Sequence, residues 1–178
     1  KEKRSYQSFI TEKYIRMSGM KKTFENVNEA KKALEEVKSL TAGKYDGTDY
    51  EFKHRAHTRS INGSVTYIVN DKREPHQDVV LYIHGGAWFQ DPLDNHFDFI
   101  DQLAGELDAR VIMPVYPKVP HRDYRTTFEL LKNIYQKEIL EVENPQHMTI
   151  MGDSAGGQIA LSFAQYLKKE TPLPQPGH

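Results

Sequence analysis

The amino-acid sequence predicts an α/β protein with a mostly parallel, doubly wound sheet and helices on both of its faces. Short, continuously apolar runs alternate along the chain with longer segments whose apolar residues recur at helical spacing. Continuous apolar runs are typical of strands that are covered on both sides, as in parallel sheets. The regular alternation of such strands with helices therefore predicts this fold class.

The individual elements follow from the same two periodicities. Strands are predicted over residues 64–69, 79–83, 110–116 and 148–151. Helices are predicted over residues 97–107, 126–141 and 155–168, and the proline-rich stretch 172–176 is predicted to be a loop. Residues 5–40 show helical spacing as well, and glycines in 41–48 separate them from the rest of the chain. We therefore expect N-terminal helices in 1–40 and one α/β part in 41–178.

The composition indicates a globular chain and excludes several functions. With 178 residues, 38% hydrophobic and 28% charged, the chain can bury a core, and disorder is not expected. A formal net charge of −1 does not provide the positive field that nucleic-acid binding uses, so no nucleic-acid partner is expected. The absence of cysteine excludes disulfides, thiolate metal sites and a cysteine nucleophile.

Neither a membrane anchor nor a metal site is predicted. No apolar run reaches the roughly 18–20 residues that span a bilayer, and the first thirty residues lack the apolar core of a secretion signal. A cytoplasmic location is the resulting expectation, although a leader could have preceded Lys1. The acidic residues between Asp91 and Asp98 lack the glycine and closing glutamate of a calcium loop. They are interpreted as solvated loop residues, and no cofactor is predicted.

The strongest chemical motif is Gly152-Asp153-Ser154-Ala155-Gly156, which fits the pattern Gly-x-Ser-x-Gly. It lies after a short predicted strand and at the start of a predicted helix, where a sharp turn can lift a serine hydroxyl clear of the sheet. The helix N-terminus behind it favours negative charge close by. These features predict Ser154 as a nucleophile.

A plainer interpretation is that this turn only caps the helix, because serine is a common capping residue. Gly157 argues against it. A second consecutive glycine in the first helical turn costs stability relative to alanine, which indicates that something must approach the backbone closely there.

A second motif, His84-Gly85-Gly86-Ala87-Trp88, directly follows the predicted strand 79–83. Acyl transfer develops an oxyanion, and backbone N–H groups presented by a glycine loop can stabilise it. Taken alone, the segment is more simply an ordinary glycine turn with a structural histidine. Its occurrence together with the serine motif favours the oxyanion loop.

The paired motifs His-Gly-Gly-x-Trp and Gly-Asp-Ser-Ala-Gly-Gly resemble the hormone-sensitive-lipase-like branch of the α/β-hydrolases, which are carboxylesterases and acetylhydrolases of small acyl esters. The resemblance extends from about Val79 to Leu173. It implies that Ser154 is acylated and that the oxyanion hole comprises the amides of Gly85, Gly86, Ala87 and Ala155. It also implies that His84 orients the loop rather than taking protons, and that the helices before residue 41 could form a cap over the acyl pocket.

Two further residues have expected roles near this site. Asp153 is too close to Ser154 in sequence to be the acid of a catalytic triad, so we expect it to form hydrogen bonds near the turn and to line the pocket. Trp88 is expected to be a wall of the pocket, with a plain core position as the alternative.

The sequence departs from the family pattern at two places. Ala87 occupies a position that is usually glycine, but an alanine still supplies its N–H. Where the family usually has a Tyr-Arg-x-x-Pro segment, this chain has Val115-Tyr116-Pro117-Lys118-Val119-Pro120, so the resemblance does not assign the support of the oxyanion loop.

The acid and the base of a catalytic triad are not recognised in the sequence. In this fold both follow the serine along the chain, but after Ser154 there is no Asp, one Glu, and a single histidine, His178. Without a base the serine is a poor nucleophile. We therefore expect the sequence to stop before the strands that carry these residues, and 178 residues alone to be inactive.

The expected function is a serine carboxylesterase acting on small to medium acyl esters. The alternatives are a non-catalytic binding protein of the same fold, and an amidase or peptidase on it. The sequence indicates a small-molecule ester as the partner and leaves the oligomeric state open.

Overall fold

The computed structural model describes residues 25–40, 45–142 and 144–178. The chain divides into two compact units, residues 1–42 and 43–178. In the first unit, helix α3 covers Val27–Leu40, with Glu29 in its first turn and Lys38 in its last, an order that suits the helix dipole. The remainder of the predicted N-terminal helices lies outside the described residues, and their role as a cap stays a prediction.

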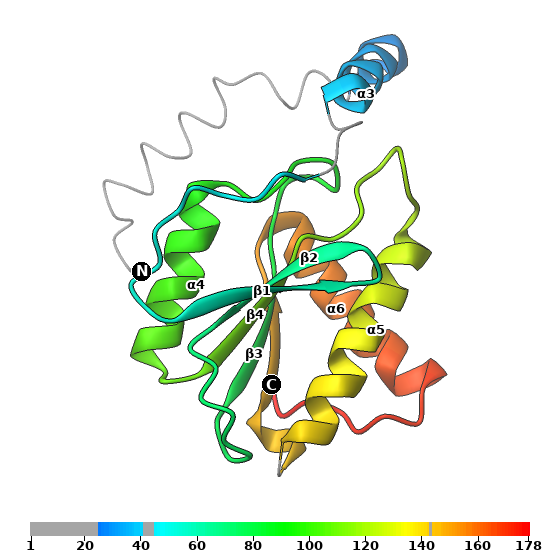
Figure 1. Ribbon diagram of the computed structural model, residues 1–178. Helices are drawn as coiled ribbons and strands as arrows, with labels where there is room; N and C mark the ends of the chain where they lie inside the picture. Colours follow the sequence, from blue (N-terminus) through cyan, green and yellow to red (C-terminus); the bar gives the residue numbers. More distant parts are fainter. Residues whose placement is uncertain (1–24, 41–44, 143) are drawn as a thin grey trace, which may run out of the picture. The chain divides into compact units, whose positions relative to one another are not determined.

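The second unit contains one five-stranded sheet (Figure 1). Its strands are β1 (Ala56–Ile61), β2 (Ser64–Val69), β3 (Val79–Ile83), β4 (Arg110–Pro114) and β5 (Met148–Gly152). They lie in the order β1-β2-β4-β3-β5. Strand β3 pairs in parallel with β4 and β5, whereas β1 with β2 and β2 with β4 are antiparallel. The predicted α/β class is confirmed, and the sheet is mixed.

Strand β1 is absent from the sequence-based prediction. It forms a hairpin with β2, in which Ile61 is opposite Ser64 and only two residues connect the strands. These are Asn62 and Gly63, with φ angles of +49° and +78°. Positive φ at both positions is the geometry of the two-residue turns that match the twist of a hairpin.

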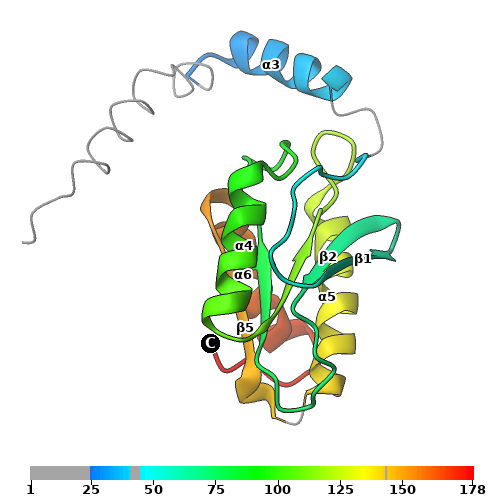
Figure 2. The ribbon, with the colours of Figure 1, turned by 60° about the vertical axis from the view of Figure 1, so that its left-hand side comes forward.

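Helices cover both faces of the sheet, as predicted (Figures 1 and 2). Helix α4 (Asp94–Glu106) covers one face, and α5 (Tyr124–Glu141) and α6 (Ser154–Glu170) cover the other. Helix α5 begins two residues before the predicted start because the Asp123 carboxylate accepts the N–H groups of Arg125 and Thr126. Within the described ranges, no helix combines the length and apolarity needed to cross a bilayer.

The last residues of the chain return to the start of β5. The Gly177 N–H donates to the Met148 carbonyl, and the Ile150 N–H donates to the His178 carbonyl. The C-terminus accordingly lies near the lower end of the sheet in Figure 1. His178 therefore lies beside the first half of β5, whereas Ser154 follows the last residue of this strand.

A buried network of charges links the start of β4 to α5. Arg110 and Glu138 are 7% and 2% exposed, and their Nη2 and Oε2 atoms are 2.9 Å apart. Arg110 also contacts Asp71 and Glu141, and Arg59 contacts both Asp71 and Glu138. Burial raises the pKa of Glu138, against the opposing effect of Arg110. The network lies at the end of the parallel strands opposite to the turn at Ser154.

Removing one partner of this network should cost far more than removing both. We expect Arg110→Met to lower the free energy of unfolding by about 3–5 kcal/mol, because it leaves buried carboxylates without their main cation. The double variant Arg110→Met/Glu138→Met should lose much less. Urea denaturation monitored by circular dichroism measures both, and equal losses would contradict this view of the network.

Candidate active site

The turn between β5 and α6 holds Ser154 in an unusual backbone conformation. Its φ is +50°, a left-handed value that costs a non-glycine residue roughly 1–2 kcal/mol. The flanking glycines explain how the turn closes. A Cβ at Gly156 would collide with the carbonyl oxygens of Ile83 and His84, and one at Gly152 would collide with the backbone of Gly156 and Ile83. The glycine pattern is therefore required by backbone contact between β3, β5 and α6.

Ser154 is exposed at the N-terminus of α6, and this terminus is not capped. The N-cap residue is Asp153, whose side chain makes no capping hydrogen bond. The first helical bond runs from the Gly157 N–H to the Asp153 carbonyl. The N–H groups before Gly157, that of Ala155 among them, therefore have no partner within the helix and favour an anion in front of them.

The interpretation of Ser154 as a mere helix cap does not fit, since the cap position belongs to Asp153. The close approach inferred from Gly157 is present, but the group that comes close is the chain's own backbone rather than a ligand. A Cβ on this glycine would lie 3.1 Å from the Gly152 carbonyl oxygen.

The glycine loop after β3 is equally unusual. Gly86, Ala87 and Trp88 have φ angles of +120°, +51° and +73°, three left-handed residues in succession. The N–H groups of Phe89 and Gln90 both donate to the Gly86 carbonyl and close the turn. Ala87 tolerates its position at a cost of roughly 1 kcal/mol or more, a cost that the glycine usual in the family would avoid.

Asp153 connects the loop to the serine turn. Its Oδ1 accepts the Gly85 N–H and the Tyr82 hydroxyl, each at 2.7 Å. A Cβ on Gly85 would collide with this carboxylate and would lie 3.2 Å from the Ser154 Cβ, so the loop passes directly beside the serine. Because the Gly85 N–H is engaged by Asp153, the predicted oxyanion donors that remain are Gly86, Ala87 and Ala155.

His84 is completely buried under the loop. Its Nδ1 lies 2.5 Å from the Gly85 carbonyl oxygen, and since a carbonyl only accepts, Nδ1 carries the proton. The ring stacks on Tyr116 with centroids 4.4 Å apart. Burial, and then the nearby Lys118 ammonium, lowers the pKa of His84 to about 3. The imidazole is therefore neutral at ordinary pH and is oriented by the loop and Tyr116.

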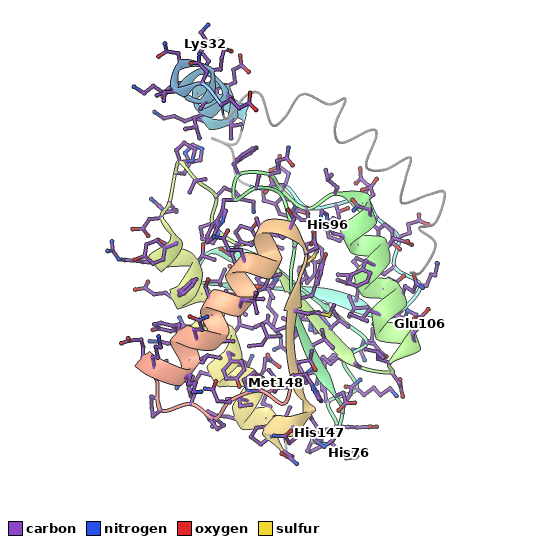
Figure 3. All side chains as sticks on the ribbon, turned by 180° about the vertical axis from the view of Figure 1, so that it is seen from behind. Lys32, His76, His96, Glu106, His147 and Met148 are labelled. Atoms are coloured by element: carbon purple, nitrogen blue, oxygen red, sulfur yellow. The ribbon has the colours of Figure 1, made fainter. Side chains whose placement is uncertain are left out.

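His96 is a site residue that the sequence did not reveal. It lies at the start of α4, at the same end of the sheet as the serine turn (Figure 3). Its Nδ1 accepts the Leu93 N–H at 2.8 Å, which leaves the proton on Nε2, 3.8 Å from the Asp153 Oδ2. His96 therefore faces the carboxylate that links the two motifs, and it also borders an apolar cavity of about 290 Å³ beside Asp153.

Trp88 joins the loop to the helix that follows the serine. Its indole N–H donates to the Gln158 Oε1 at 3.1 Å, and its ring meets that of Tyr116 edge to face at 6.2 Å. The segment after β4 also holds the loop, because the Tyr116 hydroxyl donates to the His84 carbonyl and the Val119 N–H donates to that of Trp88. This segment supplies the support that the resemblance left unassigned.

Gly85 should not tolerate a side chain. We expect Gly85→Ala to lower the free energy of unfolding by about 1–3 kcal/mol, the range for overpacking, because its Cβ collides with the Asp153 carboxylate. Gly63→Ala is the control. There φ is +78° but a Cβ meets nothing within 4 Å, so only backbone strain is added. Thermal unfolding compares them, and a smaller effect at Gly85 than at Gly63 would show that the collision is absent.

Comparisons with known proteins place the chain in a family. A family model described as "alpha/beta hydrolase fold" matches residues 80–177. An esterase from Acinetobacter venetianus is 30% identical over 95 residues, which are 53% of this chain and 31% of the relative. An ethyl acetate hydrolase from Pseudomonas putida is 28% identical over 159 residues, which are 84% of this chain and 49% of the relative.

A solved structure of an esterase candidate from Staphylococcus aureus superposes with a TM-score of 0.72 at 26% identity. The match covers 84% of this chain and 50% of that one. The chain thus spans from about a third to about half of the relatives it matches. By its family-model match and its esterase relatives, the chain belongs to the α/β-hydrolase fold family, in its hormone-sensitive-lipase-like branch.

Proposed function

We propose that the protein is a serine carboxylesterase that hydrolyses small to medium acyl esters through an acyl-enzyme on Ser154. The observation that carries the proposal is an exposed serine on a left-handed turn, directly beside a glycine loop with three left-handed residues in succession. Relatives named esterase and ethyl acetate hydrolase support an ester as the substrate class.

The proposed chemistry assigns a role to each part of the site. Ser154 Oγ attacks the ester carbonyl carbon, and the N–H groups of Gly86, Ala87 and Ala155 stabilise the oxyanion that forms. The alcohol then leaves with a proton, and water hydrolyses the acyl-serine. Trp88, fixed by Gln158, borders the acyl group. His84 does not take the proton, because it is buried and its pKa is low.

A general base is still required to activate the serine. Three histidines of the described ranges have other partners than the Ser154 Oγ. His84 donates to Gly85, His96 accepts from Leu93, and the backbone of His178 pairs with Met148 and Ile150 in the first half of β5. The proposal therefore needs a histidine and a carboxylate from outside the described residues. Their absence from the full-length protein would favour the second candidate, a binding protein that keeps the pocket.

A fluorophosphonate probe tests the nucleophile directly. We expect the probe to label Ser154 in the full-length protein at neutral pH, and Ser154→Ala to abolish the labelling. Ser162→Ala is the matched control, because Ser162 is an exposed serine on the same helix. Mass spectrometry of the labelled peptide locates the adduct. If folded full-length protein remains unlabelled, Ser154 is not an activated nucleophile and the esterase proposal fails.

The 178 residues alone should have very low activity. Because His84 and His96 are both engaged by other groups, we expect turnover of p-nitrophenyl acetate near that of the Ser154→Ala form. The liberated p-nitrophenolate is measured by its absorbance. Turnover by the 178 residues that is abolished by Ser154→Ala would mean that a residue within them serves as the base.

A further inference from the structure

Lys118 is a buried cation directly behind the glycine loop. Its side chain is 8% exposed, and its Nζ donates to the Tyr116 carbonyl at 2.6 Å. The same Nζ lies 3.3 Å from the Asp91 Oδ1 and 4.5 Å from the centroid of the Tyr116 ring. A buried ammonium has a large desolvation cost, so its partners must compensate for it through close and specific contacts.

These contacts hold the far end of the loop. The start of the loop is fixed by Asp153 and by the Tyr116 hydroxyl, and its middle by the Val119 N–H on the Trp88 carbonyl. Asp91 lies at the far end, one residue after the Gln90 N–H that closes the turn on Gly86. The ion pair with Lys118 therefore ties this end to the segment after β4.

We propose that Lys118 is a positioning residue for the oxyanion loop, and that its ammonium, bridging Asp91 and the Tyr116 carbonyl, keeps the loop that carries Gly86 and Ala87 in place beside the Ser154 turn. This inference rests on the proposed function for its kinetic consequence. Its structural part, the placement of the loop, can be measured independently of activity.

The groups around Lys118 allow its charge to be titrated separately. Asp91 faces it from the loop, and Tyr45 lies close enough to Asp91 for the carboxylate to raise the pKa of this tyrosine. His84 faces it from the end of β3, with His96 of α4 and Asp153 of the α6 turn behind that ring. Tyr116 lies under the ammonium.

The pKa values of these neighbours leave the lysine titration distinct. Burial lowers the pKa of Lys118 to about 8, against the opposing effect of Asp91. The pKa of His84 is far lower, and burial raises the pKa values of Tyr45 and Tyr116 well above 10. As the pH rises through about 8, the lysine should therefore lose its proton, and the ion pair with Asp91 should be lost with it.

Deprotonation of Lys118 should affect stability and activity in opposite directions as the pH rises. The folded-state pKa of Lys118 lies below the 10.5 of an unfolded lysine, so the unfolded chain binds more protons between about pH 8 and 10.5. The contribution of this group to the free energy of unfolding therefore increases with pH in that window. A loss of activity above pH 8 through Lys118 would reflect loop placement rather than global unfolding.

The test compares Lys118→Met and Lys118→Arg with Lys168→Met, an exposed lysine on α6 that serves as the control. Trp88 is the only tryptophan of the 178 residues and lies in the loop, so its emission reports the loop directly. Subtracting the spectrum of a Trp88→Phe counterpart isolates this signal in the full-length protein. Emission, kcat and KM for p-nitrophenyl acetate are measured from pH 6.5 to 9.5, together with the melting temperature.

We expect Lys118→Met to lower kcat roughly tenfold with little change in KM, which is less than the 10²–10³-fold cost of deleting an oxyanion donor. Its Trp88 emission at pH 7 should match that of the wild type at pH 9, and its melting temperature should not fall. Lys118→Arg should keep both signals up to pH 9, and Lys168→Met should behave as the wild type.

Wild-type emission and kcat in Lys118→Met would overturn the proposal, as would a loss of activity that only follows a lower melting temperature. A wild-type protein that fluorophosphonate does not label would instead refute the esterase. Even then, an emission change in Lys118→Met would still show that this residue places the loop.

Discussion

The hydrogen bond from the Gly85 N–H to the Asp153 carboxylate joins two segments that are 68 residues apart in the chain. Because β3 and β5 are parallel neighbours, both segments begin at the carboxyl ends of their strands. Ligand sites of open α/β sheets lie at this end. Adjacency alone does not fix one loop against the other. The Asp153 carboxylate fixes the two segments, because it accepts from the Gly85 N–H in the loop and from the Tyr82 hydroxyl on β3, the strand that precedes the loop. The link holds the loop beside the serine turn, where Ser154 and Ala87 are both exposed.

The sequence predicted the fold well where a single periodicity dominates. The buried strands β3 and β5 and the helices α5 and α6 have clear patterns, and their predicted positions are confirmed within a few residues. Strand β1 was missed because Ala56–Ile61 carries polar and charged residues at an edge of the sheet, so its apolar signal is weak. The Asn62-Gly63 dipeptide was the available signal, since it is a strong short-range indicator of a hairpin. The antiparallel pairings of β2 could not be derived, because periodicity does not report strand direction.

The glycine-rich part of the site was predictable because the need for small residues is local. The side chains that contact the glycine loop and the serine turn from elsewhere in the chain were not predictable. His96 reaches Asp153 from another helix, and Lys118 reaches Asp91 across a turn, contacts that depend on the folded chain. Asp91 was interpreted as one of several solvated acids, and only the burial of Lys118 distinguishes it. Gly85 illustrates a subtler limit. A motif can indicate that an amide belongs to a loop, but the direction of the N–H depends on backbone angles that the sequence does not specify.

The placement of the Arg110–Glu138 network at the amino ends of the parallel strands, away from the Ser154 turn, has a consequence for the evolution of the molecule. Energetic effects of distant, unconnected positions tend to be additive. Residues around the turn can therefore diversify under selection for a new ligand without weakening the ionic anchor that secures α5 to the sheet. Related proteins can therefore acquire different substitutions near the serine turn and still keep the stability that the charge network provides at the other end of the strands.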